Sequence, residues 1–323
     1  MKRNYNLLFQ GLLIICAIGF AIYIVVGTSI FSRFAEAGGE AAKENAIQES
    51  VLTQLGVVQD SRLTEISGID ASYLYPNCFW VHNDSGNPAE LFLVDSKGNT
   101  RAVVKLPGVT NVDWEDICLF SFSGTPHICV ADVGDNNASR KNCQLYVFAE
   151  PKFELPDDIG RVVTRDVSEV VQLDFQYADG PRNCEAIAVH PKRPEFYLFQ
   201  KSTQRNSKEK EFGIYKLRMK KNRKLESKVA RRIGNIKDRL VTGAAISRDS
   251  RELVFCNYVA AGWMNRPPAM DWGHYLVAAD FKMLALPVQR QGEAICFTAD
   301  GKSLVVVSEK VKQPIWKIAL PAK

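Results

Sequence analysis

The sequence predicts an all-β protein built as a β-propeller, with five blades favoured. Three observations lead to this prediction. Apolar runs of strand length follow one another from Val51 onward, with few stretches of helical period. A four-residue core recurs five times, at intervals of 48, 70, 59 and 49 residues, and further strand-length runs follow each copy. Four strands per repeat at a period near 50 residues is the pattern of a β-propeller.

The recurring core is interpreted as the first strand of each blade. Its aligned second positions are Ser67, Glu115, Glu185, Ala244 and Glu293. Small residues surround these positions, as expected where first strands converge on a central axis and bulky side chains would collide. A β-sandwich with accidental internal similarity is the alternative fold.

The outer strands of the repeats are less regular. In the fourth repeat, the third strand is predicted at 275–277 and a poor fourth strand near 284–288. The last repeat has only three clear strands, and the segment 51–58 is predicted to supply its fourth, which closes the ring and removes open edges. Six blades are the alternative to five, because the 70-residue interval is long. Within it, however, residues 151–165 are rich in Pro, Asp and Gly and are predicted as a loop.

The N-terminal part predicts attachment to a membrane. Residues 7–32 carry no charge and are long enough to cross a bilayer. We therefore expect a transmembrane anchor (1–33), a linker (34–49) and a propeller domain (50–323). Lys2 and Arg3 precede the span, so the protein is expected to be single-pass in the cell membrane, with the propeller on the periplasmic or extracellular side. A cleaved leader is the alternative, because Ala35-Glu36-Ala37 resembles a cleavage site.

The net charge of +5 does not by itself indicate nucleic acid as a partner. Residues 201–232 contain 13 Lys/Arg and 3 Glu, a local charge of +10, so the remainder of the chain carries −5. We interpret this basic segment as a solvated outer strand with its loops. It lacks the interleaved aromatic residues of a platform on which nucleic-acid bases stack, so nucleic-acid binding is not expected.

The eight cysteines do not form a zinc motif. Cys16 lies in the apolar segment, and no C-x-x-C spacing occurs among the other seven. Cys118 and Cys129 should face each other across a hairpin whose turn centres on Ser123-Gly124. A cross-strand disulfide and two small buried thiols are both open interpretations.

Acidic residues recur where the first strands begin and the second strands end. These two positions lie at the same end of an antiparallel hairpin, so the acids should gather at one mouth of the central channel. Hard cations such as Ca²⁺ bind six to eight oxygens from such groups. The predicted metal ligands are Asp84, Glu115, Asp132, Glu185 and Glu293. Further ligand-binding candidates are Lys201, Asn83, Asn257 and Glu309. Alternatively, these side chains tie neighbouring blades together through backbone N–H groups.

Six motifs resemble those of a largely uncharacterised family of exported bacterial β-propeller proteins. They are HNDSGNP at 82–88, DWEDI at 113–117, DVGDN at 132–136, DGPRNCEA at 179–186, VTGA at 241–244 and QGEAI at 291–295. The family is loosely related to esterase-like or phytase-like propellers and to TolB- and NHL-type propellers. The resemblance covers roughly residues 60–318 and implies a propeller and an export signal, but no secure reaction. Family members usually show Asp where this chain has Asn183.

The favoured function is a ligand- or partner-binding module, with Ca²⁺ in an acidic central pocket. The partner is expected to be a small molecule or another protein. The alternative is a metal-dependent hydrolase of esters, lactones or phosphoesters, so whether the protein is an enzyme stays open. His82 and His274 are the candidates for acid–base chemistry. No G-x-S-x-G, P-loop or H-E-x-x-H motif occurs.

Overall fold

The computed structural model of the protein describes residues 51–201, 212–236, 240–278, 280–287, 289 and 291–321. The predicted anchor and linker therefore lie outside the described residues. Apart from the short helix α2 (Trp272–Ala278), the regular elements described are β-strands, as the sequence predicts. No helix in this part of the chain is both long and apolar enough to cross a bilayer.

The strands form five successive four-stranded antiparallel blades. The first blade contains β2 (Ile66–Ala71), β3 (Cys78–Asn83), β4 (Glu90–Asp95) and β5 (Thr100–Lys105). The second contains β6 (Trp114–Phe122), β7 (Thr125–Asp132), β8 (Cys143–Ala149) and β10 (Val171–Tyr177). The third contains β11 (Cys184–Val189), β12 (Glu195–Gln200), β13 (Phe212–Arg218) and β14 (Val229–Ile236). The fourth contains β15 (Gly243–Ile246), β16 (Glu252–Cys256), β17 (Ala260–Asn265) and β18 (Lys282–Ala285).

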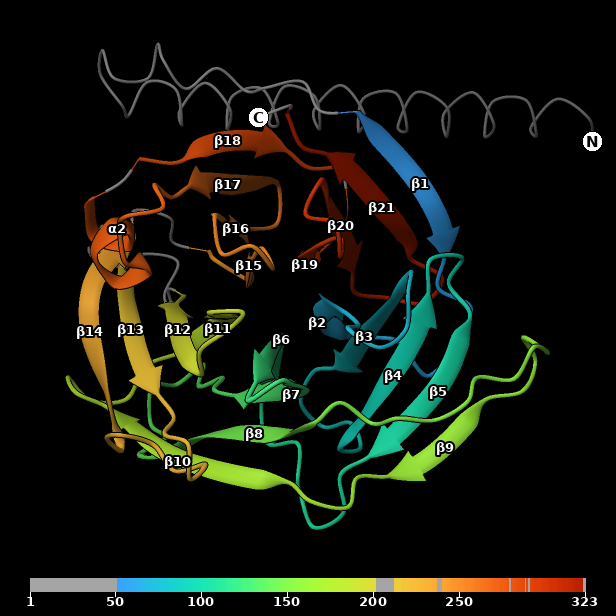
Figure 1. The fold of residues 1–323 in the computed structure, drawn as a ribbon, viewed down its shortest axis with the longest axis horizontal. Helices are drawn as coiled ribbons and strands as arrows, with labels where there is room; N and C mark the ends of the chain where they lie inside the picture. Colours follow the sequence, from blue (N-terminus) through green and yellow to red (C-terminus); the bar gives the residue numbers. More distant parts are fainter. Residues whose placement is uncertain are drawn as a thin grey trace, which may run out of the picture. The chain divides into compact units, whose positions relative to one another are not determined.

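The fifth blade joins the two ends of the described chain. It contains β19 (Gly292–Phe297), β20 (Ser303–Ser308), β21 (Pro314–Ala319) and β1 (Leu52–Val57), and β1 pairs antiparallel with β21. The predicted closure by the segment 51–58 is therefore confirmed. The first strands β2, β6, β11, β15 and β19 each contact the next, and β19 contacts β2. Figure 1 shows these five strands around a common centre, with the outer strands on the periphery.

Each blade packs both of its faces against neighbouring blades. Every residue of β3, β11 and β20 is therefore buried, whereas the edge strand β1 begins with three exposed residues. The core consists of apolar clusters that join neighbouring blades, with fully buried side chains such as Trp80, Trp114 and Phe196. Burial of each large apolar side chain contributes about 1.5–3 kcal/mol. Packing between blades thus explains why these strands show nearly continuous apolar runs.

Three outer elements differ from the sequence prediction. Residues 275–277 were expected as a strand, but they belong to helix α2, and the third strand of the fourth blade is β17. The segment is helical because Trp272 and Leu276, four residues apart, are both buried on one face while Val277 is exposed. The last three residues of the predicted loop 151–165 belong instead to a further strand, β9 (Val163–Asp166), which pairs parallel with β5. Strands β10 and β14 also pair in parallel, which joins the second and third blades at their outer edges.

Asp116 holds three first strands together at the centre of the ring. Its side chain is fully buried, and its carboxylate accepts hydrogen bonds from the backbone N–H groups of Ile117 (2.8 Å), Ile187 (2.9 Å) and Ala244 (3.3 Å). These donors belong to β6, β11 and β15. Neighbouring Gly68 has no room for a side chain, because a Cβ there would press against the backbone of Asp116 and Ile117. Small residues therefore leave room for the strands at the crowded axis, and one buried carboxylate accepts hydrogen bonds from the backbone of three of them.

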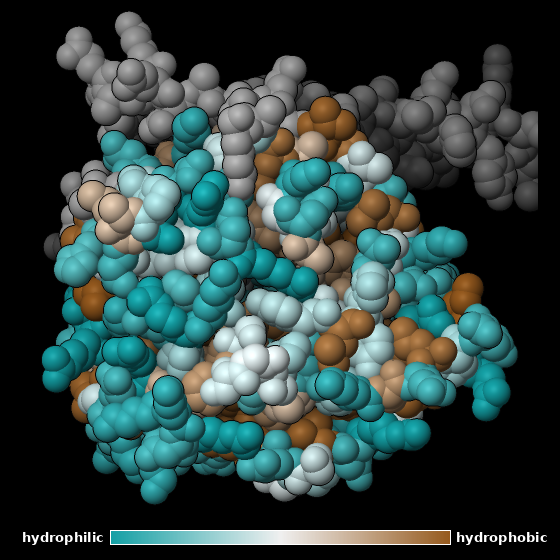
Figure 2. Space-filling view, in the orientation of Figure 1, coloured by the Kyte–Doolittle hydropathy of each residue, from teal (hydrophilic) through white to brown (hydrophobic). Residues whose placement is uncertain are grey.

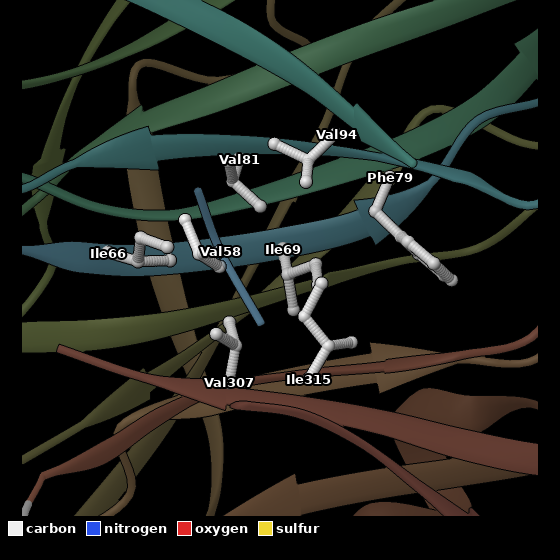
Figure 3. Close-up of a pocket in the computed structure, with 8 residues that line it drawn as sticks. All are labelled: Val58, Ile66, Ile69, Phe79, Val81, Val94, Val307 and Ile315. Carbon is white, nitrogen blue, oxygen red and sulfur yellow. The ribbon is translucent and has the colours of Figure 1, made fainter. Parts of the chain in front are cut away.

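A small apolar cavity lies between the first and fifth blades. Figure 3 shows the side chains that line it, which are Val58, Ile66, Ile69, Phe79, Val81, Val94, Val307 and Ile315. All eight are apolar, so the cavity offers no group for catalysis or for binding a charged ligand. We interpret it as an imperfection of packing between two blades.

Replacing Asp116 by Ala should lower the free energy of unfolding by roughly 3 kcal/mol or more. Three buried N–H groups lose their acceptor, and each unsatisfied buried donor costs about 1–3 kcal/mol. Asp116→Asn keeps one acceptor oxygen and should cost less. Denaturant unfolding followed by circular dichroism measures both, with the exposed Asp157→Ala as the control. An unchanged unfolding midpoint for Asp116→Ala would contradict this role.

Candidate functional site

The glutamates of the recurring core sit on β-bulges. In the pairing of first and second strands, the register shifts at Ser67, Glu115, Glu185 and Glu293, each of which is the extra residue opposite the partner strand. The fourth blade, with Ala244 at the aligned position, pairs without a shift. A bulge redirects the side chain of its extra residue. The aligned second position of the repeat is therefore a structural device that turns three glutamates away from the regular alternation of the strand.

Three carboxylates lie close enough to share a cation. Oxygens of Asp84, Asp113 and Glu115 all lie within 4.8 Å of one another. Asp84 follows β3, Asp113 precedes β6, and Glu115 is the bulge residue of β6, so two neighbouring blades build the group. We call these three residues the acidic triad. The sequence analysis placed Asp84 and Glu115 among the metal ligands but left out Asp113.

Glu115 is the most confined member of the acidic triad. It is 4% exposed, and the described residues provide its carboxylate with neither a hydrogen bond nor an ion pair. Burial raises its pKa well above the ordinary value, and the nearby carboxylates of Glu185, Asp84 and Asp113 raise it further, while Lys201 opposes them. Burial likewise raises the pKa of Asp84 to about 6. Both shifts come first from burial and then from the neighbouring carboxylates, so the charged forms of these acids are disfavoured in the absence of a cation.

Gly134 makes room for this concentration of charge. A Cβ at this position would overlap the carboxylates of both Glu115 and Asp113. Any larger residue would therefore displace two members of the acidic triad. The sequence shows that a glycine lies within the run Asp132–Asn136. Only the structure shows that this glycine closely approaches the two acids.

The other two predicted glutamates are Glu185, whose charge acts on Glu115 of the acidic triad, and Glu293, whose nearest acidic neighbour is Glu309. Glu185 binds Lys201 (2.7 Å) and accepts a hydrogen bond from the Asn183 amide (2.8 Å). Burial, and then the neighbouring Glu309, raise the pKa of Glu293 to about 9. The negative charge of Glu185 helps to raise the pKa of both Glu115 and Glu293, so these groups interact electrostatically. The structure thus brings the three bulge glutamates into one electrostatically coupled group.

Lys201 is a counter-ion within this group. Besides its ion pair with Glu185, its ammonium lies 5.3 Å from the centre of the Tyr258 ring. The Glu185 carboxylate and Tyr258 help to raise its pKa, so the residue remains charged at neutral pH. Tyr258 was not recognised in the sequence, because nothing in its local surroundings indicates a distant lysine.

Three of the named candidates have structural partners elsewhere. The buried Asp132 pairs with Arg140 (2.7 Å) and accepts N–H bonds from Val112 and Asp113, so it orients the segment that carries Asp113. The Asn83 amide donates to the carbonyl of Arg62, and its oxygen accepts from the N–H of Glu65. The Asn257 oxygen accepts N–H bonds from residues 259 and 260, as asparagine commonly does in turns. These three side chains therefore support loops and turns through backbone groups, as the alternative interpretation of the acidic and amide residues expected.

The buried histidines His82 and His190 offer little for catalysis, and the other predicted candidate, His274, lies exposed on helix α2. His82 is fully buried, and burial lowers its pKa to about 4, so its ring is neutral near pH 7. His190 lies 3.2 Å from the Ser250 hydroxyl, but its Nδ1 accepts the N–H of Lys192. The proton of the neutral ring must then reside on Nε2, which donates to Ser250 and cannot act as its base. His190 and Ser250 therefore stabilise a turn and do not form a nucleophile–base pair.

The surface of the propeller in the orientation of Figure 1 is mainly hydrophilic, with smaller hydrophobic areas between the hydrophilic ones (Figure 2).

No protein-family model matches the chain, and no curated protein matches it. Among solved structures, the chain is similar to the WD40 domain of Neurospora crassa Pan2, with 12% identity, coverage of 86% of this chain and 98% of that chain, and a TM-score of 0.42. It is also similar to U3-55K, with 8% identity, coverage of 83% and 98%, and a TM-score of 0.40. Likenesses at this level carry no argument about function. The strand order itself defines the class of protein, a β-propeller.

Stability should depend on pH through the raised pKa of Glu293. In the unfolded chain this carboxyl titrates near 4.5, whereas in the folded protein its pKa is about 9. The folded state binds more protons between these values, so the contribution of Glu293 is present below about pH 4.5 and is lost as pH rises toward 9. Without added divalent cations, the free energy of unfolding of the native protein should fall relative to that of Glu293→Gln by roughly 2 kcal/mol between pH 5 and 8. If urea unfolding gave parallel profiles of unfolding free energy against pH for the native protein and for Glu293→Gln, this assignment would be contradicted.

Proposed function

We propose that the protein is a binding module that holds a hard divalent cation, Ca²⁺, at the acidic triad and presents the surrounding loops to a small-molecule ligand or a protein partner. The observation that carries the proposal is the buried Glu115 carboxylate, which makes no hydrogen bond or ion pair among the described residues and faces two further carboxylates within 4.8 Å. A cation would neutralise all three groups together. This explains why so many acids are tolerated in one place.

The spacing of the acidic triad suits Ca²⁺. Calcium binds carboxylate oxygens at about 2.3–2.6 Å, so two oxygens on opposite sides of one ion are separated by up to about 5 Å. The 4.8 Å limit within the triad falls inside this range. Three carboxylates supply at most six of the six to eight oxygens that calcium prefers. The remaining positions are open to water or to an oxygen atom of the ligand.

The alternative function, hydrolysis of esters, lactones or phosphoesters, has one favourable observation. The pKa of Asp84, about 6, is close to the range in which a general base operates at neutral pH. Against it, Lys201 is already paired with Glu185, and neither His82 nor His190 is suited to proton transfer. Binding without turnover is therefore the better-supported function.

Calcium titration of the full-length protein by calorimetry should show one site that Glu115→Gln weakens about 10-fold or more, because the most confined ligand loses its charge. Gly134→Ala should also weaken binding, since it displaces two ligands without removing a charge. The exposed Glu154→Gln is the matched control and should bind as the native protein does.

The same samples distinguish the two functions in a screen of ester, lactone and phosphoester substrates with Ca²⁺ present. Calcium binding without turnover supports the binding module. Turnover that Glu115→Gln or Glu185→Gln abolishes would instead establish a hydrolase. Absence of both binding and turnover would exclude the acidic triad as a calcium site.

The proposal includes a membrane anchor that keeps the propeller on the periplasmic or extracellular side. Its support is the uncharged stretch 7–32 behind Lys2 and Arg3. N-terminal sequencing of the membrane-bound protein should find the original N-terminus intact. A mature chain beginning at Gly38 would show that the segment is a cleaved leader and that the protein is released.

A further inference from the structure

Two cysteines lie directly opposite each other in the hairpin of β6 and β7. The register pairs Cys118 with Cys129, as the sequence analysis expected. The hairpin turn consists of Ser123 and Gly124, with φ of 52° and 81°, which is the two-residue turn that matches the twist of a hairpin. Phe122 and Thr125 flank the turn as the last register pair. The spacing from this pair to the cysteines is regular, so their juxtaposition is fixed by the hairpin.

The position of the pair in the ladder sets its separation. A two-residue turn is closed by a hydrogen-bonded pair, and hydrogen-bonded pairs recur at every second position, which places Cys118 and Cys129 in such a pair. Pro126, which has no N–H, falls correctly at a non-hydrogen-bonded position opposite Ser121. Cα atoms of a hydrogen-bonded pair lie about 5.5 Å apart, inside the range of about 4.4–6.8 Å that a disulfide spans, but the Cβ atoms of such a pair lie about 5.5 Å apart, so forming the bond must draw the two side chains about 1 Å closer together.

Both thiols point to the same side of the second blade. Cys118 and Cys129 are 3% and 0% exposed and belong to the apolar cluster between the second and third blades. Burial raises the pKa of the Cys118 thiol well above its ordinary value, and a hydrogen bond to the Cys129 thiol adds to the effect. Both thiols are free and buried in the structure, so they are shielded from reagents once the protein has folded.

We propose that Cys118 and Cys129 are a disulfide site, joined when the chain folds in the presence of a thiol–disulfide oxidant. The two thiols lose two protons and two electrons as the S–S bond forms. The oxidant's own disulfide takes up both and is reduced to two thiols. Because the folded thiols are buried, the reaction belongs to folding and not to the finished propeller. The inference is independent of the proposed calcium binding.

Such a bond would clamp the hairpin that builds the acidic triad. Glu115 lies three residues before Cys118, and Asp132, which orients the Asp113 segment, lies three residues after Cys129. The disulfide would restrain both strands close to these acids. The thermal midpoint should therefore be several degrees higher in the oxidised protein than in the reduced protein.

The test is to unfold the full-length protein, refold it with oxidised and reduced glutathione, and alkylate it in denaturant without reduction. The number of alkylated cysteines should fall from eight to six. Chymotrypsin cleaves after Phe120 and Phe122, which lie between the two cysteines, so digestion should release two fragments that separate only after reduction. Oxidant added to the folded protein should react far more slowly.

Variants show which cysteines react. Cys118→Ala should retain seven alkylated cysteines after oxidative refolding, whereas Cys296→Ala, the control, should still lose two. Eight alkylated cysteines in the refolded native protein would overturn the proposal. So would a bond that joins Cys129 to Cys143 or Cys143 to Cys184 in place of the cross-strand pair. The native digest answers this question even if a variant fails to fold.

Discussion

The hydrogen bonds of the Asp116 carboxylate are the interaction on which the ring depends. Five first strands meet at one axis, where there is space for few side chains. One carboxylate accepts N–H groups from β6, β11 and β15, and so ties three blades at the point where they are closest. Burial raises the pKa of this carboxyl well above its ordinary value, and the backbone donors that converge on it oppose that shift. The outer strands need only pack face to face.

The bulge beside Asp116 explains how two consecutive acids have different roles. In a regular strand, Glu115 and Asp116 would simply alternate between the two faces of the blade. The register shift at Glu115 leaves Asp116 at the axis and directs Glu115 toward Asp84 and Asp113. The same shift recurs at Glu185 and Glu293. Repetition of one local irregularity therefore concentrates acids from distant parts of the chain in one place.

The sequence indicated where the candidate site lies more reliably than it indicated which of the residues could bind a cation and which support loops. The recurring core identified Glu115, Glu185 and Glu293, because a repeat in sequence implies equivalent positions around an axis. It could not show that Asp132 pairs with Arg140, or that Asn257 holds a turn. An acid at the end of a strand has the same local pattern whether it binds a cation or supports a neighbouring loop. The residue that pairs with the acid decides between these roles, and the local sequence around the acid does not reveal it.

The sequence by itself determined the class of fold, the positions of the five first strands, the closure by β1 and the facing cysteines. These follow from apolar periodicity, from the internal repeat with its incomplete last copy, and from the geometry of a two-residue turn. Only the tertiary structure decided the bulges, the parallel pairings of β9 with β5 and β10 with β14, and the helix α2 in place of a strand. These features depend on contacts between segments far apart in the chain. The same is true of Asp113, which joins the acidic triad only because a neighbouring blade brings Asp84 to it.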